Sequence, residues 1–77
     1  MNQKADQIID ASGLKCPMPL LRCKVGLKQL EPGQLLELLS DDPQTPEDVR
    51  RFIEISGHQL LKTWSADGLI HCLIQRA

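Results

Sequence analysis

The sequence predicts an α/β two-layer sandwich with the element order β-α-β-α-β-β, in which a mixed four-stranded sheet carries two helices on one face. Two segments have apolar residues at helical spacing, and a segment of strand character follows each. An Asp-Gly pair near the end of the chain separates two further strand-like segments, which is typical of a β-hairpin. Right-handed crossovers would put both helices on the same face of the sheet. At 77 residues we expect one domain, spanning residues 1–77.

The first half of the chain predicts a strand, a helix and a second strand. Residues 8–10 precede a Ser-Gly turn and suit a short strand. Apolar residues spaced three or four apart then define one face of a helix, made of Leu20, Cys23, Leu27 and Leu30. Pro32-Gly33 ends this helix, which Gly26 weakens without breaking. The almost wholly apolar run of residues 35–39 indicates a central strand.

The second half predicts a helix and a hairpin. Thr45 suits the cap of a helix, with Asp48 as its capping-box partner. A narrow buried stripe follows, made of Val49, Phe52, Ile53 and Ser56. Ile55 lies off this stripe, and Gly57 ends the helix. Residues 59–65 and 69–75 form the two strands of the hairpin.

Composition excludes several classes of function. The net charge is −1, from 9 basic and 10 acidic residues, and the chain holds one Phe, one Trp and no Tyr. The chain has no overall positive charge to hold a nucleic acid and almost no aromatic rings to stack on its bases, so we expect no direct nucleic-acid binding. The first twenty residues lack the pattern of a signal peptide, and no apolar run is long enough to span a membrane. We therefore expect a cytoplasmic protein with reduced thiols.

Two of the three cysteines fit the core. An odd count argues against a disulfide scaffold. Cys23 lies on the apolar helix face, and Cys72 alternates with Ile70 and Ile74 on the last strand. The cysteines and the two histidines have no zinc-type spacing, and no phosphate-binding loop is present, so we expect neither a metal nor a cofactor. His71 suits a sheet face, and no Asp or Ser partner that would mark a catalytic triad is visible.

Cys16 differs from the other two because it lies at the cap of the first predicted helix. The unpaired amides there stabilise a thiolate, and the flanking cations Lys15 and Arg22 act in the same direction, so we expect a lowered pKa. Pro17 and Pro19 stiffen the first helical turn below the sulfur. The alternative is a small buried apolar residue, which is the usual role of a free cysteine.

Asp41 and Asp42 follow the second predicted strand. By themselves they suit a solvated turn. If the first two strands are parallel, their carboxyl ends share one edge of the sheet, and the acidic turn then lies beside Cys16 as part of a mixed-charge docking surface.

The order of these motifs resembles the TusA/SirA-like sulfur-carrier family from about residue 8 to residue 75. The resemblance rests on Asp10, Gly13-Leu14, Cys16-Pro17-Met18-Pro19-Leu20, Pro32-Gly33, Asp41-Asp42-Pro43, Asp48, Gly57-His58 and Gly68. Met18 stands between the prolines, where TusA itself has an acidic residue.

The resemblance implies that Cys16 accepts sulfane sulfur as a persulfide, supported by Gly13, Pro17 and Pro19 of the motif. The donor would be a cysteine desulfurase or a rhodanese-type protein, and a downstream sulfur-acceptor protein would receive the sulfur for tRNA thiolation, molybdenum-cofactor enzymes or related metabolism. The resemblance places Lys24, Asp42 and Ile55 on the docking surface. With the two flanking cations, the expected partner-binding set is Lys15, Arg22, Lys24, Asp42 and Ile55. We expect a monomer.

Two other functions stay open from the sequence. One is a non-catalytic regulatory or binding module, and the other is a thiol redox sensor that uses Cys16.

Overall fold

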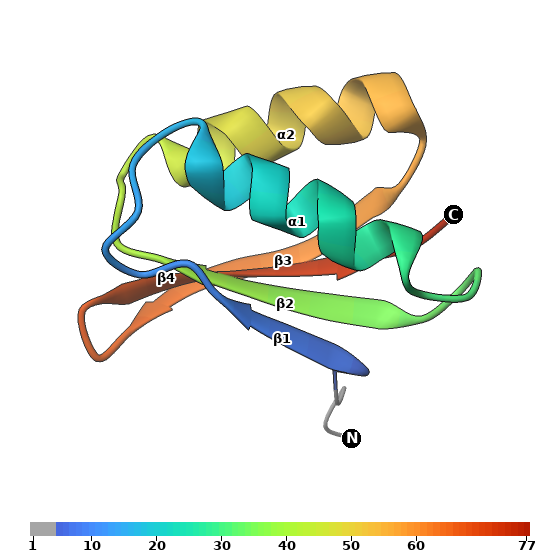
Figure 1. Ribbon diagram of the computed structural model, residues 1–77, viewed down its shortest axis with the longest axis horizontal. Helices are drawn as coiled ribbons and strands as arrows, with labels where there is room; N and C mark the ends of the chain where they lie inside the picture. The colour runs from blue at the N-terminus through green and yellow to red at the C-terminus, as the bar shows by residue number, and fades with distance from the viewer. Residues whose placement is uncertain (1–4) are drawn as a thin grey trace.

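The structure, a computed structural model, describes residues 5–77 of the chain. These residues form four strands and two helices in the predicted order, so the predicted fold class is confirmed. In chain order the elements are β1 (Gln7–Asp10), α1 (Met18–Lys28), β2 (Leu35–Ser40), α2 (Thr45–Ser56), β3 (Gln59–Ala66) and β4 (Leu69–Gln75). Figure 1 shows both helices on the same face of the sheet, with α1 and α2 side by side.

The sheet has the strand order β1-β2-β4-β3. β1 pairs with β2 in parallel, and β4 pairs antiparallel with both β2 and β3. β2 is therefore a central strand, as its apolar run predicted. Asp67 and Gly68 both have positive φ, at 54° and 77°, which is the conformation of a type I′ hairpin turn.

The core lies between the sheet and the two helices. Its buried members are Ala11, Cys23, Leu27, Leu36, Leu38, Val49, Cys72 and Ile74. The prediction that Cys23 and Cys72 belong to the core is confirmed, since both side chains are fully buried.

Gly26 has a packing role that the sequence analysis did not predict. A Cβ at this position would collide with the side chains of Ile9 and Leu36, and it would lie 2.7 Å from Leu36 Cδ1. The absence of a side chain therefore lets α1 approach the strands β1 and β2 closely.

The start of α2 differs from the predicted capping box. Its N-cap residue is Gln44, and Thr45 is the first helical residue. The Thr45 hydroxyl is buried and forms a hydrogen bond of 2.7 Å with the Ser40 hydroxyl. The Thr45 N–H, which a capping-box partner would accept, donates instead to Asp42 O at 3.0 Å, and Asp48 makes another contact, described below. At the other end of the helix, Gly57 has φ 84° and stops α2 as predicted.

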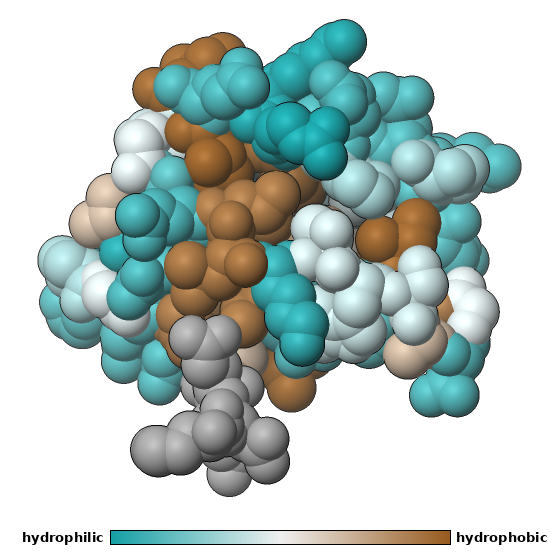
Figure 2. All heavy atoms as spheres, turned by 180° about the vertical axis from the view of Figure 1, so that it is seen from behind, coloured by the Kyte–Doolittle hydropathy of each residue, from teal (hydrophilic) through white to brown (hydrophobic). Residues whose placement is uncertain are grey.

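The sheet face opposite the helices carries a polar cluster. His71 Nδ1 lies 2.9 Å from Glu37 Oε2, and the His71 ring stacks on Trp64 with 4.8 Å between ring centroids. The sequence analysis missed Glu37 as a partner because it lies 34 residues earlier in the chain. Seen from behind, the molecule also shows a band of hydrophobic side chains between two hydrophilic areas (Figure 2).

Candidate functional site

The loop after β1 and the loop after β2 meet at one end of the molecule (Figure 1). The two strands are parallel neighbours, so their carboxyl ends lie at the same edge of the sheet. The predicted proximity of Cys16 to Asp41 and Asp42 is confirmed by hydrogen bonds between the loops. A cleft of about 410 Å³ lies between them, lined by Gly13, Leu14, Lys15, Asp41, Asp42 and Pro43.

Two carboxylates of the second loop fix the backbone of the first. Asp41 Oδ2 accepts the Gly13 N–H at 3.1 Å, and Asp42 Oδ2 accepts the Cys16 N–H at 2.8 Å. Gly13 has φ 82°, a conformation that favours glycine. The pKa of Asp42 is lowered by the backbone N–H groups of Gln44 and Cys16, and further by the charge of Lys15. An ionised Asp42 therefore positions Cys16 through its main chain.

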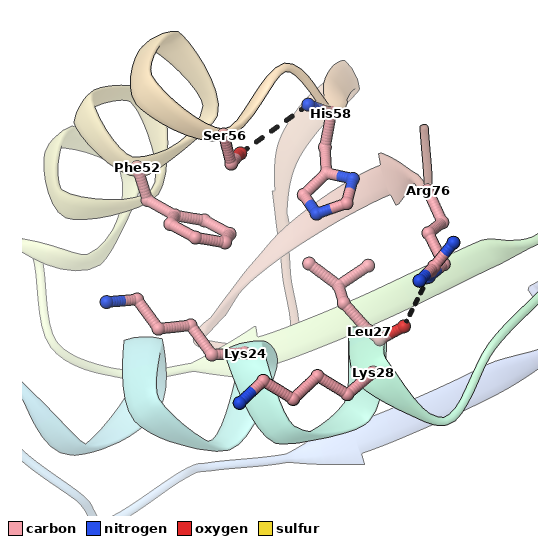
Figure 3. Close-up of a pocket in the computed structure, with 7 residues that line it drawn as sticks. All are labelled: Lys24, Leu27, Lys28, Phe52, Ser56, His58 and Arg76. Carbon is pink, nitrogen blue, oxygen red and sulfur yellow. Dashed lines mark hydrogen bonds between the residues drawn. The ribbon is translucent and has the colours of Figure 1, made fainter. Parts of the chain in front are cut away.

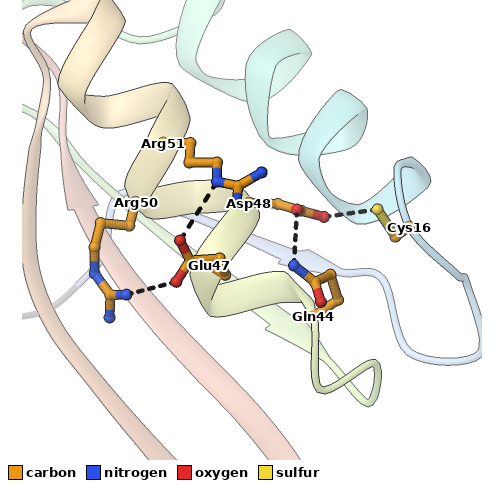
Figure 4. A network of polar contacts seen from close by, with 6 residues as sticks. All are labelled: Cys16, Gln44, Glu47, Asp48, Arg50 and Arg51. Atoms are coloured by element: carbon orange, nitrogen blue, oxygen red, sulfur yellow. Dashed lines mark hydrogen bonds and ion pairs between the residues drawn. The ribbon is translucent and has the colours of Figure 1, made fainter.

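The Cys16 thiol contacts a third carboxylate, which comes from α2. Cys16 is exposed, and its Sγ donates to Asp48 Oδ2 over 2.7 Å (Figure 4). The other Asp48 oxygen accepts from the Gln44 side-chain amide at 3.5 Å. The thiol proton is therefore already hydrogen-bonded to an acceptor within the same chain.

The expectation of a lowered thiol pKa is wrong. The pKa of Cys16 is raised, first by its hydrogen bond to Asp48, then by partial loss of water contact and by the charges of Asp48 and Asp42. All of these effects disfavour the thiolate.

The start of α1 explains why the helix amides do not reverse this effect. The N-cap residue is Pro17, one residue after the predicted cap at Cys16, so Cys16 lies outside the helix. Pro17 and Pro19 have no N–H to offer, and the Met18 N–H donates to Lys15 O at 2.8 Å. The peptide bond between Cys16 and Pro17 is cis.

A groove between α1 and α2 lies next to this thiol. It measures about 350 Å³ and is lined by Leu20, Lys24, Asp48, Arg51, Phe52 and Ile55. Ile55 is 88% exposed, and Lys24 Nζ lies 5.1 Å from the centre of the Phe52 ring. The groove brings together two residues of the expected docking set, Lys24 and Ile55, and Asp48 connects it to Cys16.

The remaining members of the expected docking set lie outside this groove. Lys15 and Asp42 line the cleft between the loops. Arg22 is exposed on α1 and is part of neither lining. The expected set is therefore divided between two adjoining surfaces, with Cys16 near both.

The two core cysteines are chemically different from Cys16. Burial raises the pKa of Cys23 to about 12 and the pKa of Cys72 to about 11. Cys16 is consequently the one thiol of the three that solvent or a partner protein can reach.

Comparison with known proteins supports the resemblance seen in the sequence. The family described as "Sulfurtransferase TusA" matches residues 7–76. The Sulfur carrier protein TusA of Allochromatium vinosum is 38% identical over 72 residues, covering 94% of this chain and 95% of that protein. The chain belongs to the TusA family.

Other TusA-family proteins agree with this assignment. The Sulfur carrier protein TusA of Pseudomonas aeruginosa is 37% identical over 62 residues, which cover 80% of this chain and 78% of that protein. The crystal structure of a SirA-like protein from Desulfitobacterium hafniense superposes with a TM-score of 0.80 at 31% identity, covering 90% of this chain and 95% of that one. The predicted family and its two-layer fold are thus confirmed.

Further features bear on what this TusA-family chain can bind. In the part of the chain that the structure describes, His, Cys, Asp and Glu side chains form no group of three or more that could hold a metal ion. Neither helix within residues 5–77 is long and apolar enough to cross a membrane.

Asp48 is the site residue that sequence reasoning missed. The sequence analysis assigns Asp48 to a capping box. Its position in the first turn of α2 could have indicated that it lies near Cys16. The argument that placed Asp42 beside Cys16 also brings the N-terminal ends of α1 and α2 together. One helical turn beyond Gln44, the N-cap of α2, the chain reaches Asp48 on the side that faces α1 (Figure 4).

Proposed function

We propose that this protein is a sulfur carrier that holds sulfane sulfur as a persulfide on Cys16 and relays it from a donor protein to an acceptor protein. The observation that carries the proposal is the contrast among the three thiols. Cys16 is exposed in a loop that two carboxylates fix, whereas Cys23 and Cys72 are buried. Membership of the TusA family supports the carrier role.

Loading is a displacement at sulfur. The Cys16 sulfur attacks the outer sulfur of the donor's persulfide, so a new S–S bond forms on Cys16 as the donor's S–S bond breaks. The donor cysteine leaves as a thiolate and takes up a proton, which balances the proton that Cys16 loses. Asp48 Oδ2, 2.7 Å from Sγ, is the acceptor through which that proton can leave.

Unloading repeats the displacement with an acceptor thiol. That thiol attacks the outer sulfur, and Cys16 leaves and regains a proton, so the transfer causes no net oxidation or reduction. A second accessible thiol nearby would instead release the sulfur and leave a disulfide. Cys23 lies about 7.5 Å of helical rise beyond Met18, the first residue of α1, and Cys16 lies before the start of that helix, whereas a disulfide allows roughly 7 Å between Cα atoms. Burial of Cys23 adds to this protection.

The donor is of the cysteine desulfurase or rhodanese type, and the acceptor is a further protein thiol. We propose that the donor docks on the groove of Lys24 and Ile55 and on Asp42, with Lys15 and Arg22 at the margin. Ile55 supplies exposed apolar surface, and the charged groups set orientation. A monomeric state and a cytoplasmic location, where thiols stay reduced, are further parts of this proposal.

The carrier role is tested with a cysteine desulfurase and cysteine carrying radioactive sulfur. Wild-type protein should gain label that dithiothreitol removes, and Cys16→Ser should gain none. Cys23→Ser is the matched control and should load like wild type, provided that circular dichroism shows it to be folded. Label on Cys16→Ser, or unlabelled wild type across several desulfurases and rhodanese-type donors, would contradict the proposal.

Two further measurements on Cys16 distinguish the two alternative functions. Oxidation of Cys16 by peroxide without persulfide loading would favour a redox sensor. Full biological activity of Cys16→Ser would favour a binding module.

Docking is tested by charge reversal. Lys24→Glu should slow loading about tenfold or more, because it turns an attractive contact with the donor into a repulsive one. Lys62→Glu is the matched control, since Lys62 also lies over an aromatic ring, Trp64, but on β3. Equal loading rates for the two variants would show that Lys24 is not part of the docking surface.

A further inference from the structure

A third cavity lies beside the C-terminal halves of the two helices, away from the Cys16 loop. It measures about 290 Å³ and is lined by Lys24, Leu27, Lys28, Phe52, Ser56, His58 and Arg76 (Figure 3). Met18, which begins α1, and Leu27 are separated by about 14 Å of helical rise. Apart from Lys24 and Phe52, its lining residues belong to neither of the two surfaces described near Cys16.

The cavity is positively charged. Lys24, Lys28 and Arg76 contribute three cations, and its lining, which lies entirely within the described residues, contains no Asp or Glu. The C-terminal ends of α1 and α2 each contribute roughly −0.5 of a charge, about −1 together. Even if the main-chain carboxylate of Ala77 is counted as another negative charge, the balance stays at about +1. Complementing the helix dipoles therefore does not account for all of these cations.

Two of the polar groups are held in place before any ligand arrives. Arg76 Nε donates to Leu27 O at 2.8 Å, which fixes the guanidinium at the wall of the cavity, and its Nη1 donates to Ala77 O at 3.2 Å. His58 Nδ1 accepts the Ala77 N–H at 2.9 Å. In neutral His58 this bond places the ring proton on Nε2, where it can be donated to an anion.

The apolar part of the lining is formed by Leu27 and by two rings. Phe52 and His58 lie 5.8 Å apart between ring centroids, at an interplanar angle of 47°. Lys24 Nζ lies 5.1 Å from the centre of the Phe52 ring, so its position is also defined. An apolar floor with a few converging polar groups is the usual composition of a small-molecule site, and this volume lies near the lower end of such sites.

We propose that this cavity binds a small organic anion whose charged group pairs with the cations Arg76, Lys28 and Lys24 and whose ring or short apolar part packs on Phe52 and Leu27. Lys24 and Phe52 also line the groove beside Asp48. A bound anion would thus share Lys24 with the surface proposed for donor docking.

The test uses phenyl phosphate as the probe. Inorganic phosphate and phenol, which correspond to its charged part and its ring, are the two controls. Titrations of 15N-labelled protein followed by NMR should show saturable shifts with phenyl phosphate, with a Kd below about 1 mM. The shifts should centre on Leu27, Ser56 and His58 and leave Gly13 unmoved. Each half alone should bind at least about tenfold more weakly, since neither makes both contacts. No saturable shift, or equal binding of inorganic phosphate, would overturn the proposal.

Variants locate the site and separate it from the carrier function. Lys24→Gln should weaken phenyl phosphate binding about threefold or more through loss of one of the three cations. Lys62→Gln, whose lysine also lies over a ring, should bind like wild type. Cys16→Ser should bind normally, so a failed carrier assay would leave this result unchanged. Equal losses in the Lys24 and Lys62 variants would contradict the assigned site.

Discussion

The Cys16 sulfur lies 2.7 Å from Oδ2 of Asp48, and this contact couples the start of α2 to the loop that precedes α1. It raises the pKa of the thiol, so the empty carrier holds its proton at neutral pH. A persulfide is more acidic than its parent thiol, and its outer sulfur lies one bond farther from the carboxylate. The contact therefore suppresses the reactivity of the empty carrier more than that of the loaded one.

Replacing Asp48 tests this effect directly. Asp48→Asn removes the negative charge, so the pKa of Cys16 should fall and the thiolate fraction at pH 7 should rise. Alkylation by iodoacetamide, measured against pH, should be faster than in wild type at neutral pH and should reach its plateau at lower pH. Glu47→Gln is the control, because Glu47 pairs with Arg50 and Arg51 away from the thiol (Figure 4). An alkylation profile of Asp48→Asn that overlays wild type would refute the coupling.

The three thiols should differ in accessibility. At pH 8, native protein should take up one iodoacetamide group, on Cys16, because burial raises the pKa of Cys23 to about 12 and that of Cys72 to about 11. In denaturant all three should react. Intact-mass measurement counts the adducts, and two rapid adducts on the native protein would show that a buried cysteine is exposed.

Acid should release the Cys16 loop at an unusually low pH. The N–H groups of Gln44 and Cys16 lower the pKa of Asp42 in the folded protein. The stabilisation from these bonds is therefore complete above the ordinary aspartate pKa of about 3.9, and it is lost as pH falls through the lower, folded value. The Cys16 amide shift in NMR should follow this titration, and Asp42→Asn should abolish it. A transition at or above the ordinary value would argue against the bond.

Gly26→Ala should destabilise the fold although alanine favours helices. The helical gain is roughly 1 kcal/mol, whereas overpacking costs about 1–3 kcal/mol, and the new Cβ collides with Leu36, which is fully buried. We expect a net loss of up to about 2 kcal/mol in urea unfolding. Val25→Ala, at an exposed neighbour, should change stability by less than about 0.5 kcal/mol. A more stable Gly26→Ala protein would show that the helix can move away from the sheet.

The fold followed from local patterns in the sequence. Helical spacing placed Cys23 on the inner face of α1, strand alternation placed Cys72 in the core, and Asp67-Gly68 marked the hairpin. Parallel pairing of the first two strands then placed Asp42 beside Cys16 without any side-chain information. These predictions succeeded because each depends on a short stretch of chain or on a general rule of topology.

The chemistry of the thiol depended on a contact that is remote in sequence. Cys16 and Asp48 are 32 residues apart, and the helix-start pattern at Thr45 gave Asp48 a different interpretation. The expected pKa direction was wrong because the prolines and the Lys15 carbonyl leave the first turn of α1 few amides for the sulfur. The Glu37–His71 pair joins two neighbouring strands and was also missed, because its two residues lie far apart in the sequence.

The central claim is that one sulfur atom resides on Cys16 and moves onward. The most direct measurement is peptide mass spectrometry of the protein after incubation with a cysteine desulfurase and cysteine, before and after an acceptor thiol is added. The account predicts one added sulfur on the peptide that contains Cys16, and its loss with restoration of the free thiol when the acceptor is present. Sulfur on the Cys23 or Cys72 peptide instead, or a Cys16 peptide that never gains sulfur, would contradict it.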